Sequence, residues 1–255
     1  MNLIPADTRV LRTWPMGESS MIVAMLSREQ GVLRAVVKGA RDPKKRIRAL
    51  LDPGTALTVQ LYLKKSGLHL VKELSARGRL PLVSRDLSSL ALRMAALELV
   101  LITSREEGAL EGLYELLEDY LGVYETEGPP PWLAFFSFEA HLLLLHGLLP
   151  SLELCGVCGE EIGEGSLRFM TASASFVCRS CHGDGIDLAP AEGDCLVSLL
   201  REGPGAQLGR EVEPSLRKKL GRLLHHALGM HLPSYRLPRS LDLIRSQAPG
   251  KKEDA

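Results

Sequence analysis

Two short cysteine motifs constrain the fold of this chain more than any other feature of its 255 residues. Cys155-Gly-Val-Cys158 and Cys178-Arg-Ser-Cys181 each place two thiols on one tight turn, and residues 159–177 separate the two motifs. Four thiols at this spacing are typical of a tetrahedral zinc site. Four thiolates leave the metal no open position for water, so we expect one structural Zn²⁺ and not a catalytic ion.

Other uses of these cysteines fit the sequence less well. No signal peptide follows Met1, and Cys195 remains without a partner, so the sequence favours a reducing cytoplasm over a disulfide-forming compartment. A redox C-x-x-C site normally accompanies a βαβ pattern, which neither motif has. His182 could in principle replace its neighbour Cys181 as a ligand, but the paired C-x-x-C spacing favours the cysteine.

Charge is distributed very unevenly along the chain, although its formal sum is zero. Residues 1–80 carry 15 Lys and Arg against 6 Asp and Glu, a net charge of +9, and the remaining residues carry 16 against 25, a net charge of −9. A positive module attracts polyanions and binds them with a strong dependence on salt. The N-terminal part is therefore expected to bind nucleic acid.

Alternating hydrophobicity in the basic module predicts a small β-barrel. Five runs have period two and are separated by Gly and Pro: residues 8–14, 20–26, 32–38, 57–63 and 68–74. Five short antiparallel strands in about eighty residues fit a closed barrel, of which the OB-fold is the leading choice. An SH3-like barrel remains an alternative.

Cations gather on the third expected strand and on the loop after it. Arg34 and Lys38 share a strand face, and the adjoining loop is the most concentrated positive charge in the chain. The candidate DNA-binding cations of this region are Arg34, Lys38, Arg41, Lys44, Lys45, Arg46 and Arg48. Most runs of basic residues form loops that are simply solvated. Here the whole N-terminal module is basic, which favours binding of nucleic acid.

Aromatic residues for base stacking are scarce in the barrel. Tyr62 shares a strand face with Lys64, and Lys65 follows, so these three residues join the candidate DNA site. Trp14 is expected to seal one end of the barrel instead. Binding should then be mainly electrostatic, with little sequence preference, because phosphate contacts do not read bases.

After Gly78 the hydrophobic period changes to that of helices. Ser84 is expected to cap the first helix, Pro130 and Pro131 to open a long apolar helix that reaches Leu149, and Pro190 and Pro214 to start two more. Glu139 and two histidines interrupt the apolar run, so it is read as a central buried helix and not as a membrane span.

The fold class that follows is α+β and multidomain, an OB-like barrel followed by an all-α domain with an inserted four-cysteine ribbon. The expected limits are 1–80 for the barrel, 81–150 with 188–245 for the helices, 151–187 for the ribbon and 246–255 for a disordered tail. No catalytic motif is present, and His225, His226 and His231 lack the spacing of a metal-binding helix, so we expect no enzyme activity.

The order of these parts resembles the RecO family of bacterial recombination and repair mediators. The resemblance covers nearly the whole chain and includes Gly17-Glu18-Ser19-Ser20, Gly31 and Lys38-Gly39-Ala40-Arg41. It implies a cytoplasmic, nucleoid-associated protein that binds single-stranded and duplex DNA and anneals complementary strands. It also implies partnership with RecR and single-stranded-DNA-binding protein, and help for RecA in loading onto DNA coated by that protein.

The charge of the helical part complicates one of these implications. In the family, a helical-domain groove is expected to receive the acidic tail of single-stranded-DNA-binding protein, yet residues 82–154 carry three arginines against twelve acidic residues. The cationic start of the last long helix, at Arg217, Lys218 and Arg222, is the better receiver, with a solvated helix face as the alternative. Two other functions stay open: a zinc-ribbon factor that binds RNA or acts in transcription, and an adaptor that binds only proteins.

Overall fold

The computed structural model describes residues 2–42, 47–78, 86–104, 108–125, 128–163, 167–178, 180–232 and 235–245. The chain forms two compact units, Met1–Glu125 with Pro238–Ala255, and Thr126–Leu237. The helices that follow the barrel are thus divided between the two units. The expected disordered tail, 246–255, lies outside the described residues.

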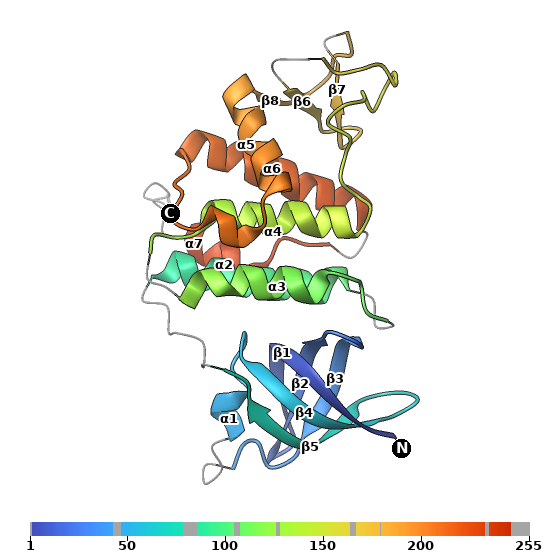
Figure 1. The fold of residues 1–255 in the computed structure, drawn as a ribbon, viewed down its shortest axis with the longest axis vertical. Coiled ribbons are helices and arrows are strands. Elements are labelled where there is room, and N and C mark those ends of the chain that lie inside the picture. Colours follow the sequence, from blue (N-terminus) through green and yellow to red (C-terminus); the bar gives the residue numbers. More distant parts are fainter. Residues whose placement is uncertain are drawn as a thin grey trace, which may run out of the picture. The chain divides into compact units, whose positions relative to one another are not determined.

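Five strands close into a barrel at the start of the first unit (Figure 1). They are β1 (Asn2–Met16), β2 (Ser20–Ser27), β3 (Gly31–Val37), β4 (Ala56–Leu63) and β5 (His69–Ala76). The order around the barrel is β1-β2-β3-β5-β4, and the short helix α1 (Ile47–Leu50) lies between β3 and β4 in the chain. All neighbouring strands are antiparallel except β3 and β5, which meet in parallel at two residue pairs. This five-stranded Greek-key order confirms the expected OB-like barrel.

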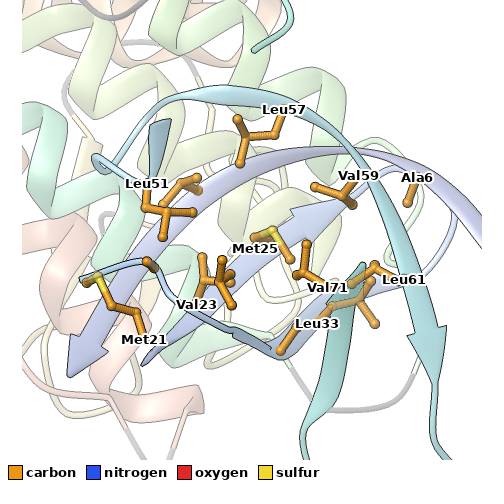
Figure 2. Packing of buried hydrophobic residues seen from close by; sticks show 14 residues of the cluster. Ala6, Met21, Val23, Met25, Leu33, Leu51, Leu57, Val59, Leu61 and Val71 are labelled. Carbon is orange, nitrogen blue, oxygen red and sulfur yellow. The ribbon is translucent and has the colours of Figure 1, made fainter. Parts of the chain in front are cut away.

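Alternate residues of each strand fill the barrel, as their period of two requires. Met21, Val23 and Met25 point inward from β2, and Leu57, Val59 and Leu61 do so from β4 (Figure 2). Leu51, directly after α1, is 2% exposed and belongs to the same cluster. The residues between them in the strands face outward. Some of these, such as Ala24, are still buried, and the exposed ones, such as Arg34, form surface that can meet a ligand.

Two longer helices follow the barrel in the first unit, α2 (Leu87–Thr103) and α3 (Leu113–Gly122), with the single turn η1 (Val123–Glu125) after α3. The N-cap of α2 is Asp86, whose carboxylate accepts the backbone N–H of Ser89 at 2.7 Å. The sequence placed this cap at Ser84, which lies outside the described residues; the cap is Asp86, which satisfies one free N–H group of the first turn. The chain returns to α2 through η3 (Arg239–Leu241) and α7 (Asp242–Arg245), and the N–H of Arg239 donates to Glu98 at 2.9 Å.

The second unit combines helices with a small sheet. Its helical elements are α4 (Trp132–Leu145), α5 (Pro190–Arg201), η2 (Pro204–Gln207) and α6 (Pro214–His231). A three-stranded sheet of order β7-β6-β8 contains β6 (Leu167–Met170), β7 (Ser175–Val177) and β8 (Gly185–Leu188). Proline starts α5 and α6 as expected, because its missing N–H is not needed in the first turn.

Helix α4 is the buried centre of this unit, and it packs against α5, α6 and η2. Every residue from Leu133 to Ala140 is buried. The helix ends at Leu145, earlier than the expected Leu149, because Gly147 adopts a left-handed backbone conformation with φ 66°. Among the described residues, no helix has both the length and the apolar character needed to cross a membrane.

Candidate metal centre and nucleic-acid interface

The four predicted ligands meet in one cluster of the second unit. The sulfur atoms of Cys155, Cys158, Cys178 and Cys181 all lie within 4.8 Å of one another. The sulfurs of Cys158 and Cys178 are 3.6 Å apart, and all five cysteines of the chain are free thiols. Corners of a tetrahedron around zinc, with Zn–S bonds of about 2.3 Å, lie about 3.8 Å apart. The cluster therefore fits one metal ion, and His182 is not part of it.

The four thiols shift one another's pKa because they lie so close together. Hydrogen bonds led by the backbone N–H of Cys158 lower the pKa of the Cys155 thiol to about 6. Hydrogen bonding with the sulfur of Cys158 raises the pKa of Cys181 to about 12. Four sulfurs this close cannot all ionise beside one another without a positive charge between them. A divalent ion would supply that charge.

Tight backbone turns hold the sulfurs in place. The N–H of Gly159 donates to the carbonyl of Cys155 at 2.9 Å, and the N–H of Gly156 donates to the carbonyl of Phe176 at 2.9 Å. A Cβ on Gly156 would lie 2.3 Å from the Ser175 hydroxyl, so a side chain there would push the first knuckle away from β7. Glycine is thus required for the close approach of the knuckle to the sheet.

The ribbon is attached to α6, and α6 in turn is joined to α5. The Nε2 of His226 lies 2.6 Å from the carbonyl of Thr171, and its ring packs edge-on against Phe169. Lys219 of α6 donates to Glu192 of α5 at 2.5 Å. His226, expected to be an ordinary histidine, thus has a structural role, which its spacing in sequence could not reveal.

Several predicted DNA-binding cations lie on the outside of the barrel. Arg34 is exposed on β3, and Lys38 is exposed directly after that strand. Arg48 is exposed on α1. Lys64 and Lys65 are exposed in the connection between β4 and β5. OB-folds bind oligonucleotides on the face of strands 2 and 3 and at the β1–β2 and β4–β5 loops, so Arg34 and the two lysines occupy such positions.

Arg41 joins two loops on this side of the barrel. Its backbone N–H donates to the carbonyl of Ser19 at 2.9 Å, and its guanidinium Nη1 donates to the carbonyl of Gly17 at 2.6 Å. The loop after β3 is therefore tied to the β1–β2 loop. Lys44, Lys45 and Arg46, the remaining predicted cations of this loop, lie outside the described residues.

Tyr62 lines a groove of about 680 Å³ between β5, β4 and the end of β3. Leu70 is its cross-strand partner and lines the same groove. Lys38 and Lys72 contribute positive charge to the lining, and Glu73 contributes one negative charge. The groove combines an aromatic ring, an apolar floor and two cations.

Trp14 does not seal the barrel, contrary to expectation. It pairs with Ile22, which points outward between the inward residues Met21 and Val23. The Trp14 ring is half-buried, and the guanidinium of Arg12 lies 5.3 Å from its centroid. A register shift between Val10 and Arg12 sets which residues of β1 face outward, and strand alternation alone could not predict this shift.

Comparison with known proteins supports one family. Two family models match the chain: Recombination protein O N terminal over residues 1–78, and Recombination protein O C terminal over residues 84–241. DNA repair protein RecO of Anaeromyxobacter sp. (strain K) is 31% identical over 238 residues, which cover 89% of this chain and 92% of that protein. The chain belongs to the RecO family of DNA repair proteins.

More distant members of the RecO family match almost end to end. DNA repair protein RecO of Geobacter sulfurreducens is 29% identical over 249 residues, covering 98% of this chain and all of that protein. The protein of the same name from Bacillus pumilus is 26% identical over 259 residues, covering 98% and 99%. RecO proteins are non-enzymatic recombination mediators, which confirms the expectation that the chain is not an enzyme.

The third group of predicted residues lies near the start of α6. Lys218 and Arg222 are exposed, whereas Arg217 is half-buried with its guanidinium 4.7 Å from the centre of the Trp132 ring. Arg217 therefore has an aromatic partner within its own unit, and Lys218 and Arg222 are the more accessible cations of this helix. Sequence reasoning also missed Lys72, which lines the groove together with Lys38 and Tyr62 and pairs with Glu73 at 3.7 Å.

Proposed function

We propose that this RecO-family protein is a recombination mediator that binds single-stranded and duplex DNA through its barrel. In this role it anneals complementary strands and, with RecR, helps RecA load onto DNA coated by single-stranded-DNA-binding protein. It acts in the cytoplasm, at the nucleoid. The observation that supports this proposal best is the position of Arg34, Lys64 and Lys65, which coincides with the oligonucleotide-binding face and loops of OB-folds.

Electrostatics provides the mechanism of annealing. Two DNA strands repel one another through their phosphates, and cations held between them lower that repulsion. Arg34, Lys38, Arg41 and Arg48, together with Lys44, Lys45 and Arg46, contact phosphates, with Tyr62, Lys64 and Lys65 beside them. Contacts to the backbone leave base identity unread, so a strand of any sequence is accepted.

The metal in this proposal is one structural Zn²⁺ held by Cys155, Cys158, Cys178 and Cys181. Zinc prefers four thiolates in a tetrahedral arrangement, and the sulfur spacing fits that geometry. Four protein ligands leave no position for water. The ion therefore supports the fold of the ribbon and takes no part in a reaction.

The cationic start of α6 is proposed to bind the acidic tail of single-stranded-DNA-binding protein. Lys218 and Arg222 offer exposed positive charge, and Arg217 lies beside Trp132. An acidic peptide gains favourable charge contacts there that it cannot gain on the acidic helix α3. Loss of tail-peptide binding in Lys218→Ala/Arg222→Ala, with DNA binding kept, is the expected result.

The salt dependence of DNA binding tests the main proposal. We expect a variant with Arg41, Lys44, Lys45 and Arg46 changed to alanine to show a shallower slope of affinity against salt, and slower annealing, than the wild type. Each lost phosphate contact lowers the slope by about 0.7 to 0.9. Lys218→Ala/Arg222→Ala, on the other unit, is the control and should keep the wild-type slope.

Other outcomes of this experiment favour other functions. Identical curves of DNA affinity against salt for the wild type and the barrel variant would mean that DNA binds elsewhere than on this loop. A preference for RNA of the same length, or loss of binding when the ribbon is removed, would favour a zinc-ribbon RNA-binding or transcription factor. Absence of binding to any nucleic acid at low salt would favour an adaptor that binds only proteins.

A further inference from the structure

Two anchors connect the four-cysteine ribbon to α6. The Nε2 of His226 lies 2.6 Å from the carbonyl of Thr171, in the turn between β6 and β7. Lys219 donates to Glu192 at 2.5 Å. Glu192 lies in the first turn of α5, which begins two residues after the last ribbon strand, β8. Both anchors therefore depend on the position of the ribbon strands.

A continuous line of contacts leads from the first cysteine knuckle to His226. The N–H of Gly156 donates to the carbonyl of Phe176 on β7 at 2.9 Å. The Phe176 ring packs edge-on against Phe169 with 5.4 Å between ring centres, and Phe169 packs edge-on against His226 at 6.1 Å. The second knuckle begins at Cys178, directly after β7. The position of His226 is thus linked to the fold of both knuckles.

The exposed cations of α6 lie beside these two anchors. Lys218 directly precedes Lys219, and Arg222 lies one turn before His226. Side chains four residues apart are neighbours on one side of a helix, which places Lys218, Arg222 and His226 on the same side of α6. Lys218 and Arg222 are exposed, whereas His226 is half-buried against the ribbon. The cationic surface is therefore continuous with the ribbon anchor.

The first half of α6 needs support from outside the helix. Within the part of the chain that the structure describes, no side chain caps its first turn. Gly221 is a poor helix former, and Lys218 and Arg222 repel one another at four-residue spacing. Packing on α4 supports only the buried side of the helix. Lys219 and His226 supply support on the side that faces the ribbon.

The ribbon itself depends on its four thiolates. Their sulfurs lie within 4.8 Å of one another, and like charges this close repel unless a cation lies between them. The free energy of metal binding to such a site becomes free energy of folding, because the unfolded chain has no preformed site. Without the metal, Phe169 and Thr171 are expected to leave their places beside His226.

We propose that the ribbon positions the cationic surface of α6, so that an acidic peptide binds there tightly only when the four cysteines hold their metal. This inference rests on the proposed binding of an acidic tail at α6 and assigns the regulation of that site. His226 and Lys219 are the positioning residues. Coupling between two sites is reciprocal, so the peptide should raise the affinity of the cysteines for zinc by the same factor.

The test measures peptide binding and zinc binding on the same protein samples. A fluorescent peptide with the acidic tail sequence of single-stranded-DNA-binding protein is titrated into the full-length chain, either zinc-loaded or stripped with a chelator. We expect stripping to lower the peptide affinity of the wild type about fivefold or more, and the peptide to raise zinc affinity equally. Hydrogen exchange of the α6 amides should be faster in the stripped protein, because the helix has lost its anchors.

Two variants separate positioning from other effects of metal removal. His226→Ala and Glu192→Gln leave the four cysteines and the cations of α6 in place. Each variant should keep its zinc, bind the peptide more weakly than the wild type, and respond less to stripping. His231→Ala is the matched control, because His231 is exposed at the end of α6, and it should behave as the wild type does. If His226→Ala loses its zinc, Glu192→Gln decides the result.

Contrary results separate this inference from the function on which it rests. Equal peptide affinity of the wild type with and without zinc would overturn the inference, while the proposed tail site stands. A wild-type response to stripping that persists unchanged in both variants would overturn the role of the two anchors. If the zinc-loaded wild type does not bind the peptide at low salt, the proposed tail site itself fails.

Discussion

Arg9 of β1 and Glu118 of α3 form an ion pair that joins the barrel to a helix of the same unit. Arg9 Nη2 donates to one oxygen of Glu118 at 2.8 Å, and its Nε donates to the other. The side chains are only 16% and 26% exposed. Burial by itself raises the pKa of Glu118, but the hydrogen bond and charge of Arg9, with help from Arg77, lower it overall. The carboxylate is thus held ionised.

We expect Glu118→Gln to lower the free energy of unfolding by about 2 kcal/mol near neutral pH, because Arg9 loses its partner in a partly buried place. A depressed carboxyl pKa contributes stability above the pKa of the unfolded chain, and this is lost as pH falls through the folded pKa. The difference in the free energy of unfolding between Glu118→Gln and the wild type should therefore shrink below about pH 4. Urea unfolding at several pH values measures this difference.

Glu115→Gln is the matched control for that prediction. Glu115 lies on the same helix and pairs with Arg28, but both side chains are about half exposed. An exposed pair contributes about 0 to 1 kcal/mol. Equal losses in the two variants would contradict a special role for Arg9 and Glu118.

Gly31 lies in close contact with the backbone that leads into α3. It has φ +69°, and an added Cβ would lie 2.3 Å from the carbonyl oxygen of Gly108. We expect Gly31→Ala to cost about 3 kcal/mol or more, because left-handed strain adds to a clash that no side chain can relieve. Gly17 has φ +58°, but an added Cβ there would meet no atom within 4 Å. Gly17→Ala should therefore lower the free energy of unfolding by about 1 to 2 kcal/mol. Thermal unfolding compares the two, and a similar fall in Tm for both would refute the clash.

Glu139 is fully buried in α4, with an oxygen 3.2 Å from Nδ1 of His225, which in turn lies 2.5 Å from the Tyr235 hydroxyl. Burial raises the pKa of Glu139 well above its usual range. A raised carboxyl pKa favours folding at low pH, and this advantage is lost as pH rises from the unfolded value toward the folded one. Glu139→Gln should therefore stabilise the protein at alkaline pH and have little effect near pH 4.

Thermal unfolding from acidic to alkaline pH checks this prediction. Glu153→Gln is the control, because Glu153 is exposed and its replacement makes the same chemical change at the surface of the second unit. Parallel profiles for the wild type and Glu139→Gln would show that the Glu139 carboxyl does not titrate with a raised pKa.

The cysteine cluster predicts one bound zinc per chain. Cys155→Ser or Cys178→Ser should lose the metal and loosen the ribbon, because three thiolates and a hydroxyl bind zinc less tightly. The barrel belongs to the other unit and should stay folded. Cys195→Ser is the control, since Cys195 is outside the cluster. The zinc content of the purified variants tests this prediction. Unchanged zinc content in both cluster variants would rule out the assignment of these cysteines as zinc ligands.

Local patterns were enough to predict the main elements. Alternation gave the five barrel strands to within a few residues at most ends, although β1 begins at Asn2 and not at Thr8. Proline marked the starts of α5 and α6, and cysteine spacing predicted the cluster. These features depend on neighbours within a few residues, and their physical causes operate before the chain has folded.

The sequence by itself determined a basic barrel, a helical part and a four-thiolate ribbon, because period, turn residues and ligand spacing are local properties. Only the tertiary structure decided that Trp14 faces outward, because a register shift in β1 sets the direction of its side chain. No residue type in β1 predicts that shift. It also decided that His226 attaches the ribbon to α6 and that Leu70 lies beside Tyr62 across two strands. Such relationships join residues far apart in the chain, and they exist only when strands pair and helices pack.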